Sequence, residues 1–203
     1  MKENTSNKGL EGQSLPQLLE GMHATTLEVY QAIEEAMPQI EEVCESVYNV
    51  LEGGGRLFYI GAGTSGRLGI LDASECPPTF GSDPECVVGL IAGGDQAIRN
   101  AVEFAEDDEE QAFKDLLDQG INKKDIVLGI AASGNTPYVI GGLRDAQQQG
   151  IATACITCNA QGKLLAYSDK PIVVNTGEEF IHGSTRLKAG SAQKLILNMI
   201  TTT

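Results

Sequence analysis

The feature that most constrains this chain is a series of short apolar runs without polar alternation, separated by stretches with helical spacing. A strand buried on both faces has no polar side, and such strands occur in parallel sheets that helices cover on both faces. The pattern predicts an α/β fold with a five-stranded parallel sheet, doubly wound and flavodoxin-like. The predicted strands span residues 57–60, 86–92, 126–131, 154–157 and 172–174.

The chain before the first strand has a different character. Residues 1–13 are polar and contain glycine, which predicts a flexible leader. Residues 14–52 carry apolar side chains at helical spacing, with Pro38 at a first-turn position. This predicts two helices that pack on the domain or on a partner subunit. Residues 53–203 then form the single α/β domain.

Polar residues mark the expected starts of helices inside the domain. Asp95 precedes a helix predicted over 96–105, and Thr136-Pro137 precedes one over 138–149. Ser184 precedes the last, which extends to residue 200.

Charge and cysteine content exclude several functions. The formal net charge of −14 would repel nucleic acid and anionic membranes. There is no apolar run that could span a bilayer and no signal-peptide pattern, so we expect a cytoplasmic protein. Five cysteines, an odd number, indicate reduced thiols. Cys155 and Cys158 form a CxxC, but within an apolar run, which favours buried strand cysteines over a redox or metal site.

Two loops have the composition of an anion site at the carboxyl ends of strands. Residues 61–66, GAGTSG, follow the first strand and precede a helix. Gly63 allows the backbone to approach a ligand closely, and the Thr64 and Ser65 hydroxyls can donate hydrogen bonds to phosphate or sugar oxygens. This GxGxxG also matches a dinucleotide fingerprint, but no acidic residue ends the second strand, which argues against a nicotinamide or flavin site. The P-loop motif GxxxxGK[ST] is absent from the sequence, so a P-loop nucleotide site is not supported. The second loop follows the third strand and offers Ser133, Gly134 and Thr136.

Candidate acids and bases follow these loops. Glu75 precedes Pro77 and Pro78, which are expected to stop the helix and hold the carboxyl group at a rigid end. Glu103 and Glu106 belong to an acidic run and would lie one helical turn apart, where partial burial would raise one pKa.

Residues 182–188, HGSTRLK, are expected to open the last helix. Ser184 is a candidate hydroxyl ligand, and Arg186 and Lys188 supply the positive charge that the other loops lack. His182 could titrate, although a structural role is favoured.

The motif GAGTSGRLGILDASECPP at 61–78 resembles the signature of the N-acetylmuramic acid 6-phosphate etherases and the related glucokinase regulatory proteins. Similar segments follow at 89–94, 132–139, 183–190 and 193–194, so that the resemblance covers about 53–200. Family members continue into a further C-terminal helical region. Asn135 stands where the family pattern has an arginine, and His182 where it has a small residue.

The resemblance implies a sugar isomerase (SIS) domain that cleaves the D-lactyl ether of a 6-phosphosugar without metal or nucleotide. It implies that Glu75 and Glu106 are the catalytic carboxylates, and we take Glu75 as the acid and Glu106 as the base, with the reverse order open. It also implies a homodimer in cell-wall sugar recycling. A non-catalytic sugar-phosphate sensor and a phosphosugar isomerase remain alternatives. The residues expected to bind substrate are Gly63, Thr64, Ser65, Ser133, Gly134, Thr136, Ser184 and Lys188.

Overall fold

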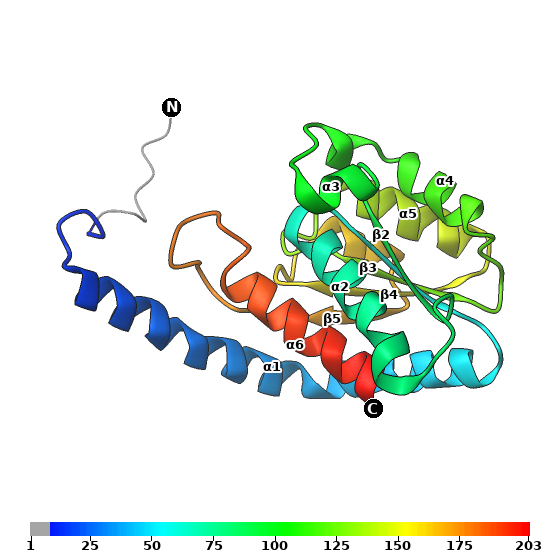
Figure 1. Ribbon diagram of the computed structural model, residues 1–203, viewed down its shortest axis with the longest axis horizontal. Helices are drawn as coiled ribbons and strands as arrows, with labels where there is room; N and C mark the ends of the chain where they lie inside the picture. The colour runs from blue at the N-terminus through cyan, green and yellow to red at the C-terminus, as the bar shows by residue number, and fades with distance from the viewer. Residues whose placement is uncertain (1–8) are drawn as a thin grey trace.

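The computed structural model describes residues 9–203 and forms one α/β domain with a long N-terminal helix (Figure 1). The predicted leader, residues 1–13, falls largely outside the described residues. The strands are β1 (Leu57–Gly61), β2 (Val87–Ile91), β3 (Ile126–Ile130), β4 (Ala152–Thr157) and β5 (Lys170–Val173). The helices are α1 (Leu15–Glu52), α2 (Gly63–Phe80), α3 (Asp95–Arg99), α4 (Gln111–Asp118), α5 (Pro137–Gln148) and α6 (Lys188–Thr202), with 3-10 turns η2 (Ala105–Asp107) and η3 (Lys163–Tyr167).

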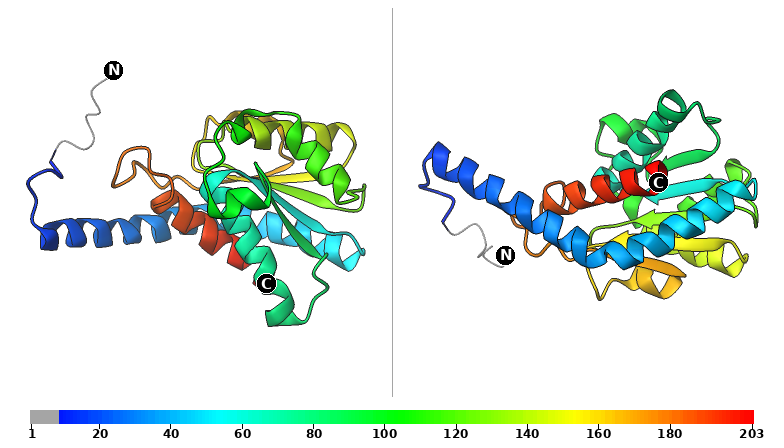
Figure 2. Two further views of the ribbon diagram at one scale, coloured as in Figure 1. Left: turned by 45° about the horizontal axis from the view of Figure 1, so that its top comes forward. Right: turned by 90° about the horizontal axis from the view of Figure 1, so that it is seen from below.

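The five strands form one parallel sheet in the order β2-β1-β3-β4-β5, as predicted. Side chains of β1 alternate between two apolar clusters. Leu57 and Tyr59 join the cluster under α1, α2 and α6, whereas Phe58 and Ile60 join the cluster under α4 and α5. Figures 1 and 2 show these two helical layers on either side of the sheet. Burial on both faces explains why the strands lack polar alternation.

The expectation of two N-terminal helices is wrong, because α1 is one helix of 38 residues that passes through Pro38. Buried side chains recur at helical spacing on both sides of the proline, including Ile33, Ala36 and Ile40. Packing of this continuous stripe stabilises the helix more than one missing hydrogen bond destabilises it. The first half of α1 extends beyond the sheet (Figure 1).

The tandem prolines of α2 also lie inside their helix instead of stopping it. Only Thr79 and Phe80 follow Pro78 in the helix, so the two prolines lie in its last turn. The helix ends at Phe80, where Gly81 adopts a left-handed conformation and donates to the Pro77 carbonyl.

Two predicted helices are shorter than expected. The helix predicted over 96–105 ends at Arg99. The last helix begins at Lys188, so Ser184 does not cap it. Instead, the carboxylate of Glu179 accepts hydrogen bonds from the Lys188 and Ala189 amides over 2.8 and 3.0 Å. A carboxylate satisfies the unpaired amides of a helix N-terminus and complements its dipole.

We expect Pro38→Ala to stabilise the protein. Pro38 is exposed, so its removal costs no packing, and alanine restores a hydrogen bond to the Glu34 carbonyl. The gain should be about 1–2 kcal/mol, because the helical penalty of proline is partly offset by its restriction of the unfolded chain. Urea unfolding measures this gain in stability. An unchanged or lower unfolding midpoint would show that Pro38 does not destabilise α1.

Candidate active site

The topological switch point lies between β1 and β3. The chain leaves β1 through α2 toward β2, and leaves β3 through α5 toward β4, on the other side. Ligands of open parallel sheets bind where such connections diverge at the carboxyl edge. Because β1 and β3 are hydrogen-bonded neighbours, the loops that follow them, residues 62–66 and 132–136, begin side by side.

The first loop is built by a close approach of strand and helix. A Cβ on Gly66 would lie 2.6 Å from Cγ1 of Ile91 and 2.8 Å from the Gly61 oxygen. Gly63 has a φ of 53°, a left-handed conformation that disfavours side chains. The turn therefore starts α2 directly above β1. The first amides of α2 have no acceptor within the helix and point to the carboxyl edge, where an anion can bind.

The Ser65 hydroxyl does not face the crevice. It is buried and donates to Oε1 of Gln193 on α6 over 2.9 Å. Gln193 is fully buried, and within residues 9–203 its Nε2 has no hydrogen-bond partner. Thr64 lies against Gly190 of the same helix, where an added Cβ would be 3.4 Å from its methyl group. Ser65 therefore fastens the α2 N-terminus to α6.

The second loop presents exposed polar groups. The Ser133 side chain is exposed and its hydroxyl accepts a hydrogen bond from the Asn135 amide over 3.1 Å. Thr136 is the residue before α5, as predicted. Gly134 has a φ of 68°, and a Cβ there would lie 2.6 Å from the Gly162 Cα. Glycine is thus required where this loop crosses the loop after β4.

Glu106 lies at the same edge of the sheet. The segment that carries it is held at both ends. Val102 packs on Gly93 after β2, and the Glu109 backbone packs against Gly141 of α5. Glu106 is exposed in η2, so a ligand at this edge can reach its carboxylate. The predicted helical pairing of Glu103 with Glu106 is wrong, because Phe104 takes a φ of 62° between them.

The structure does not bring Glu75 to this edge. Glu75 follows Ser65 by ten positions along α2, about 15 Å at the usual helical rise. It is exposed beside a hollow of about 250 Å³ between α2 and α6. Within one chain, Glu75 and Glu106 therefore lie near opposite edges of the sheet and on different helical layers.

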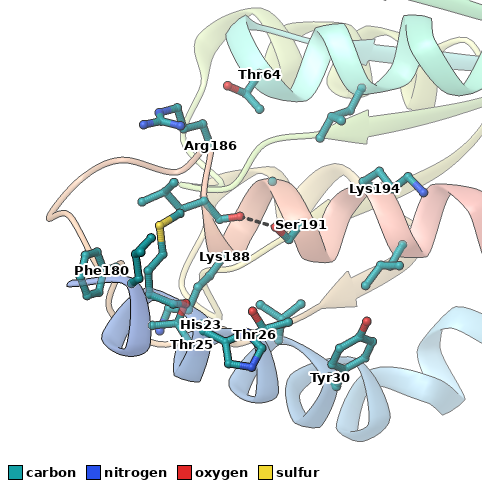
Figure 3. A pocket seen from close by; sticks show the side chains of 17 residues that line it. His23, Thr25, Thr26, Tyr30, Thr64, Phe180, Arg186, Lys188, Ser191 and Lys194 are labelled. Atoms are coloured by element: carbon teal, nitrogen blue, oxygen red, sulfur yellow. Dashed lines mark hydrogen bonds between the residues drawn. The ribbon is translucent and has the colours of Figure 1, made fainter. Parts of the chain in front are cut away.

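The basic residues of segment 182–188 line a different space. Lys188 is only 4% exposed, and its ammonium group pairs with Glu28 of α1 over 2.5 Å. Arg186 is exposed and lines a pocket of about 670 Å³ between α1 and α6 (Figure 3). Ser184 is half-buried in the preceding turn, and His182 is exposed.

Three residues that contribute here escaped prediction: Glu28, Glu179 and Gln193. The glutamates look like ordinary solvated charges in the sequence, and each acquires a role only through tertiary contact. The sequence did offer one signal for Gln193, because the residues three and four positions away from it on the predicted helix are apolar and were expected to be buried.

Cys155 is a buried residue of β4, as expected, whereas Cys158 directly follows the strand and is half-buried. Burial raises the pKa of the Cys155 and Cys158 thiols to about 11, so both are protonated at neutral pH. All five cysteines are unpaired. In the described part of the chain, no group of three or more His, Cys, Asp or Glu side chains is arranged to hold a metal ion. The same residues contain no helix long and apolar enough to cross a bilayer.

Comparison with known proteins identifies the class. The model described as "Glucokinase regulatory protein N-terminal SIS domain" matches residues 39–147, and the SIS domain model matches 96–203. The fold is similar to phosphoheptose isomerase GmhA from Neisseria gonorrhoeae, with a TM-score of 0.64, 19% identity and coverage of 91% of this chain and 97% of that one. The Vibrio vulnificus NanR protein complexed with ManNAc-6P has a TM-score of 0.60, 14% identity and coverage of 89% and 60%. The protein is thus a SIS-domain protein.

Sequence relatives define the family more narrowly. The N-acetylmuramic acid 6-phosphate etherase of Christiangramia forsetii is 56% identical over 193 residues, which are 95% of this chain and 70% of that protein. The etherase of Bacillus cereus is 54% identical over 199 residues, or 98% and 68%. The chain belongs to the N-acetylmuramic acid 6-phosphate etherase family.

We expect Ser65→Ala to destabilise the protein by about 1–3 kcal/mol, because it leaves the buried amide of Gln193 without its remaining partner. Ser133→Ala is the matched control and should change stability by less than about 0.5 kcal/mol, since Ser133 is exposed. Urea unfolding of both variants measures the difference. Equal stability of the two would contradict the structural role of Ser65.

Proposed function

We propose that this protein cleaves the D-lactyl ether of N-acetylmuramic acid 6-phosphate to N-acetylglucosamine 6-phosphate and D-lactate. The observation that carries the proposal is the meeting of the 62–66 and 132–136 loops at the switch point, with Glu106 at the same edge. Family membership and a relative of the fold solved with ManNAc-6P support a phosphosugar ligand. Five unpaired cysteines fit a reducing compartment such as the cytoplasm.

The phosphate is bound without lysine or arginine in the loops themselves. The hydroxyls of Ser133 and Thr136, the backbone around Gly134 and the Tyr138 amide, the first N–H of α5, form one side of the cradle. Gly63, Thr64 and the first amides of α2 form the other. Helix dipoles and amide hydrogens then replace full charges, as they do at other helix N-termini that bind anions.

The reaction requires one base and one acid. In the open-chain sugar, the C1 aldehyde acidifies the C2 proton, which Glu106 removes as a carboxylate. The electron pair left at C2 forms the C2–C3 double bond while the C3–O bond breaks, and Glu75 protonates the departing lactate oxygen. Water then adds at C3 of the unsaturated aldehyde, its hydroxyl going to C3 and a proton returning to C2. The reverse assignment of the two glutamates uses the same steps.

A homodimer resolves the separation of these carboxylates. We infer that each site combines Glu106 of one subunit with Glu75 of the other. The surface around Glu75 suits an interface, because Leu71 and Phe80 of the same helix are also exposed. The first half of α1 projects from the domain (Figure 2) and adds further exposed apolar groups, such as Leu15 and Leu27.

We expect Glu75→Gln and Glu106→Gln each to reduce lactate release at least a hundredfold, because glutamine cannot transfer the proton. Glu85→Gln, an exposed site before β2 at the other edge of the sheet, is the control and should keep native activity. Release is measured enzymatically with N-acetylmuramic acid 6-phosphate. Native activity in either variant would refute the catalytic assignment. If the native protein bound the sugar but released no lactate, it would be a sensor, the alternative favoured by the glucokinase regulatory protein match.

A mixture of the two inactive variants tests the shared site. In a mixed dimer, one site receives both glutamines and the other receives both glutamates. After unfolding and refolding together, random pairing should restore about a quarter of the native activity. Mixtures that stay inactive, although mixed dimers are detected by mass, would place both carboxylates of each site in a single chain.

A further inference from the structure

A cavity lies beside the first loop of the proposed sugar-phosphate site. It measures about 670 Å³ and lies between the first half of α1, the segment before α6 and the first turns of α6. Thr64, a residue of the first loop, also lines it. Figure 3 shows Thr64 and Arg186 close together at one end and Lys194 toward the other. A ligand in the crevice can therefore extend past Thr64 into this pocket.

The charge of the pocket is opposite to that of the protein. Arg186, Lys188 and Lys194 line it, and among the described residues no aspartate or glutamate does, although the net charge of the chain is −14. Glu28 neutralises Lys188 from the side of α1. Arg186 and Lys194 make no ion pair within residues 9–203 and remain available to an anion. A local cationic site in an acidic protein favours an anionic ligand group.

The remaining lining is mixed in character. Met22 and Phe180 provide apolar surface, whereas Thr26 and Tyr30 carry hydroxyl groups. The pocket therefore offers apolar surface for a methyl group and cations for a carboxylate. The phosphate cradle does not need these cations, since its loops bind through amides and hydroxyls.

We propose that this pocket receives the lactyl arm of the substrate and that Arg186 binds its carboxylate. The inference rests on the proposed function, because only the substrate and not the product sugar carries this arm. The planar guanidinium can bind both carboxylate oxygens at once, which gives specificity as well as attraction. Arg186 thus distinguishes a lactyl phosphosugar from a plain one.

Calorimetric titration with two sugars tests the proposal. N-acetylglucosamine 6-phosphate, which is not consumed, is titrated into the native chain and also into the Glu75→Gln chain with and without Arg186→Gln. N-acetylmuramic acid 6-phosphate is titrated in the Glu75→Gln background to prevent turnover, with and without Arg186→Gln. Lys123→Gln, which removes one exposed positive charge between α4 and β3, is the matched control. Thermal unfolding verifies that each variant is folded.

We expect the lactyl sugar to bind more tightly than the product sugar. Arg186→Gln should weaken the lactyl sugar about tenfold or more, while affinity for the product sugar changes less than about twofold. Lys123→Gln should change neither. Equal weakening of both sugars, or an unchanged preference, would overturn the role of Arg186 while leaving phosphosugar binding intact. A native chain that binds no product sugar would instead overturn the proposed function and this inference with it.

Discussion

The close approach of β1 and α2 at Gly61 and Gly66 is the constraint on which the site depends. No side chain fits there, since a Cβ on Gly66 would lie 2.6 Å from Ile91. The turn points the first amides of α2 to the carboxyl edge and buries Ser65 against Gln193 of α6. Lys188 then joins α6 to Glu28 of α1. The glycine turn thus places the α2 N-terminus at the carboxyl edge and against α6.

The site divides its tasks between neutral and charged regions. Backbone amides and hydroxyls at the switch point form the proposed phosphate cradle, and the cations lie apart, in the pocket between α1 and α6. The proposed carboxylates are also separated, because α2 carries Glu75 away from the edge where Glu106 lies. In this account a second copy of the chain supplies the carboxylate that each site lacks, so catalysis depends on dimer formation.

Local pattern predicted the sheet and the glycine turns after β1 and β3, because burial on both faces and close approach of the backbone leave direct marks in the sequence. The prolines misled prediction. Pro38 and Pro77 looked like helix boundaries, but tertiary packing and nearness to a helix end outweighed their local preference. The links from Ser65 to Gln193 and from Glu28 to Lys188 join residues 128 and 160 positions apart. No local pattern encodes such contacts.

The most direct test of the central claim is a crystal structure of the protein soaked with N-acetylglucosamine 6-phosphate. The account predicts phosphate oxygens within hydrogen-bonding distance of the Ser133 and Thr136 hydroxyls and of the Tyr138 amide at the start of α5. It also predicts that the pocket beside Arg186 holds no part of this sugar. A phosphate bound to Arg186 or Lys194, with the crevice between the two loops empty, would contradict the account.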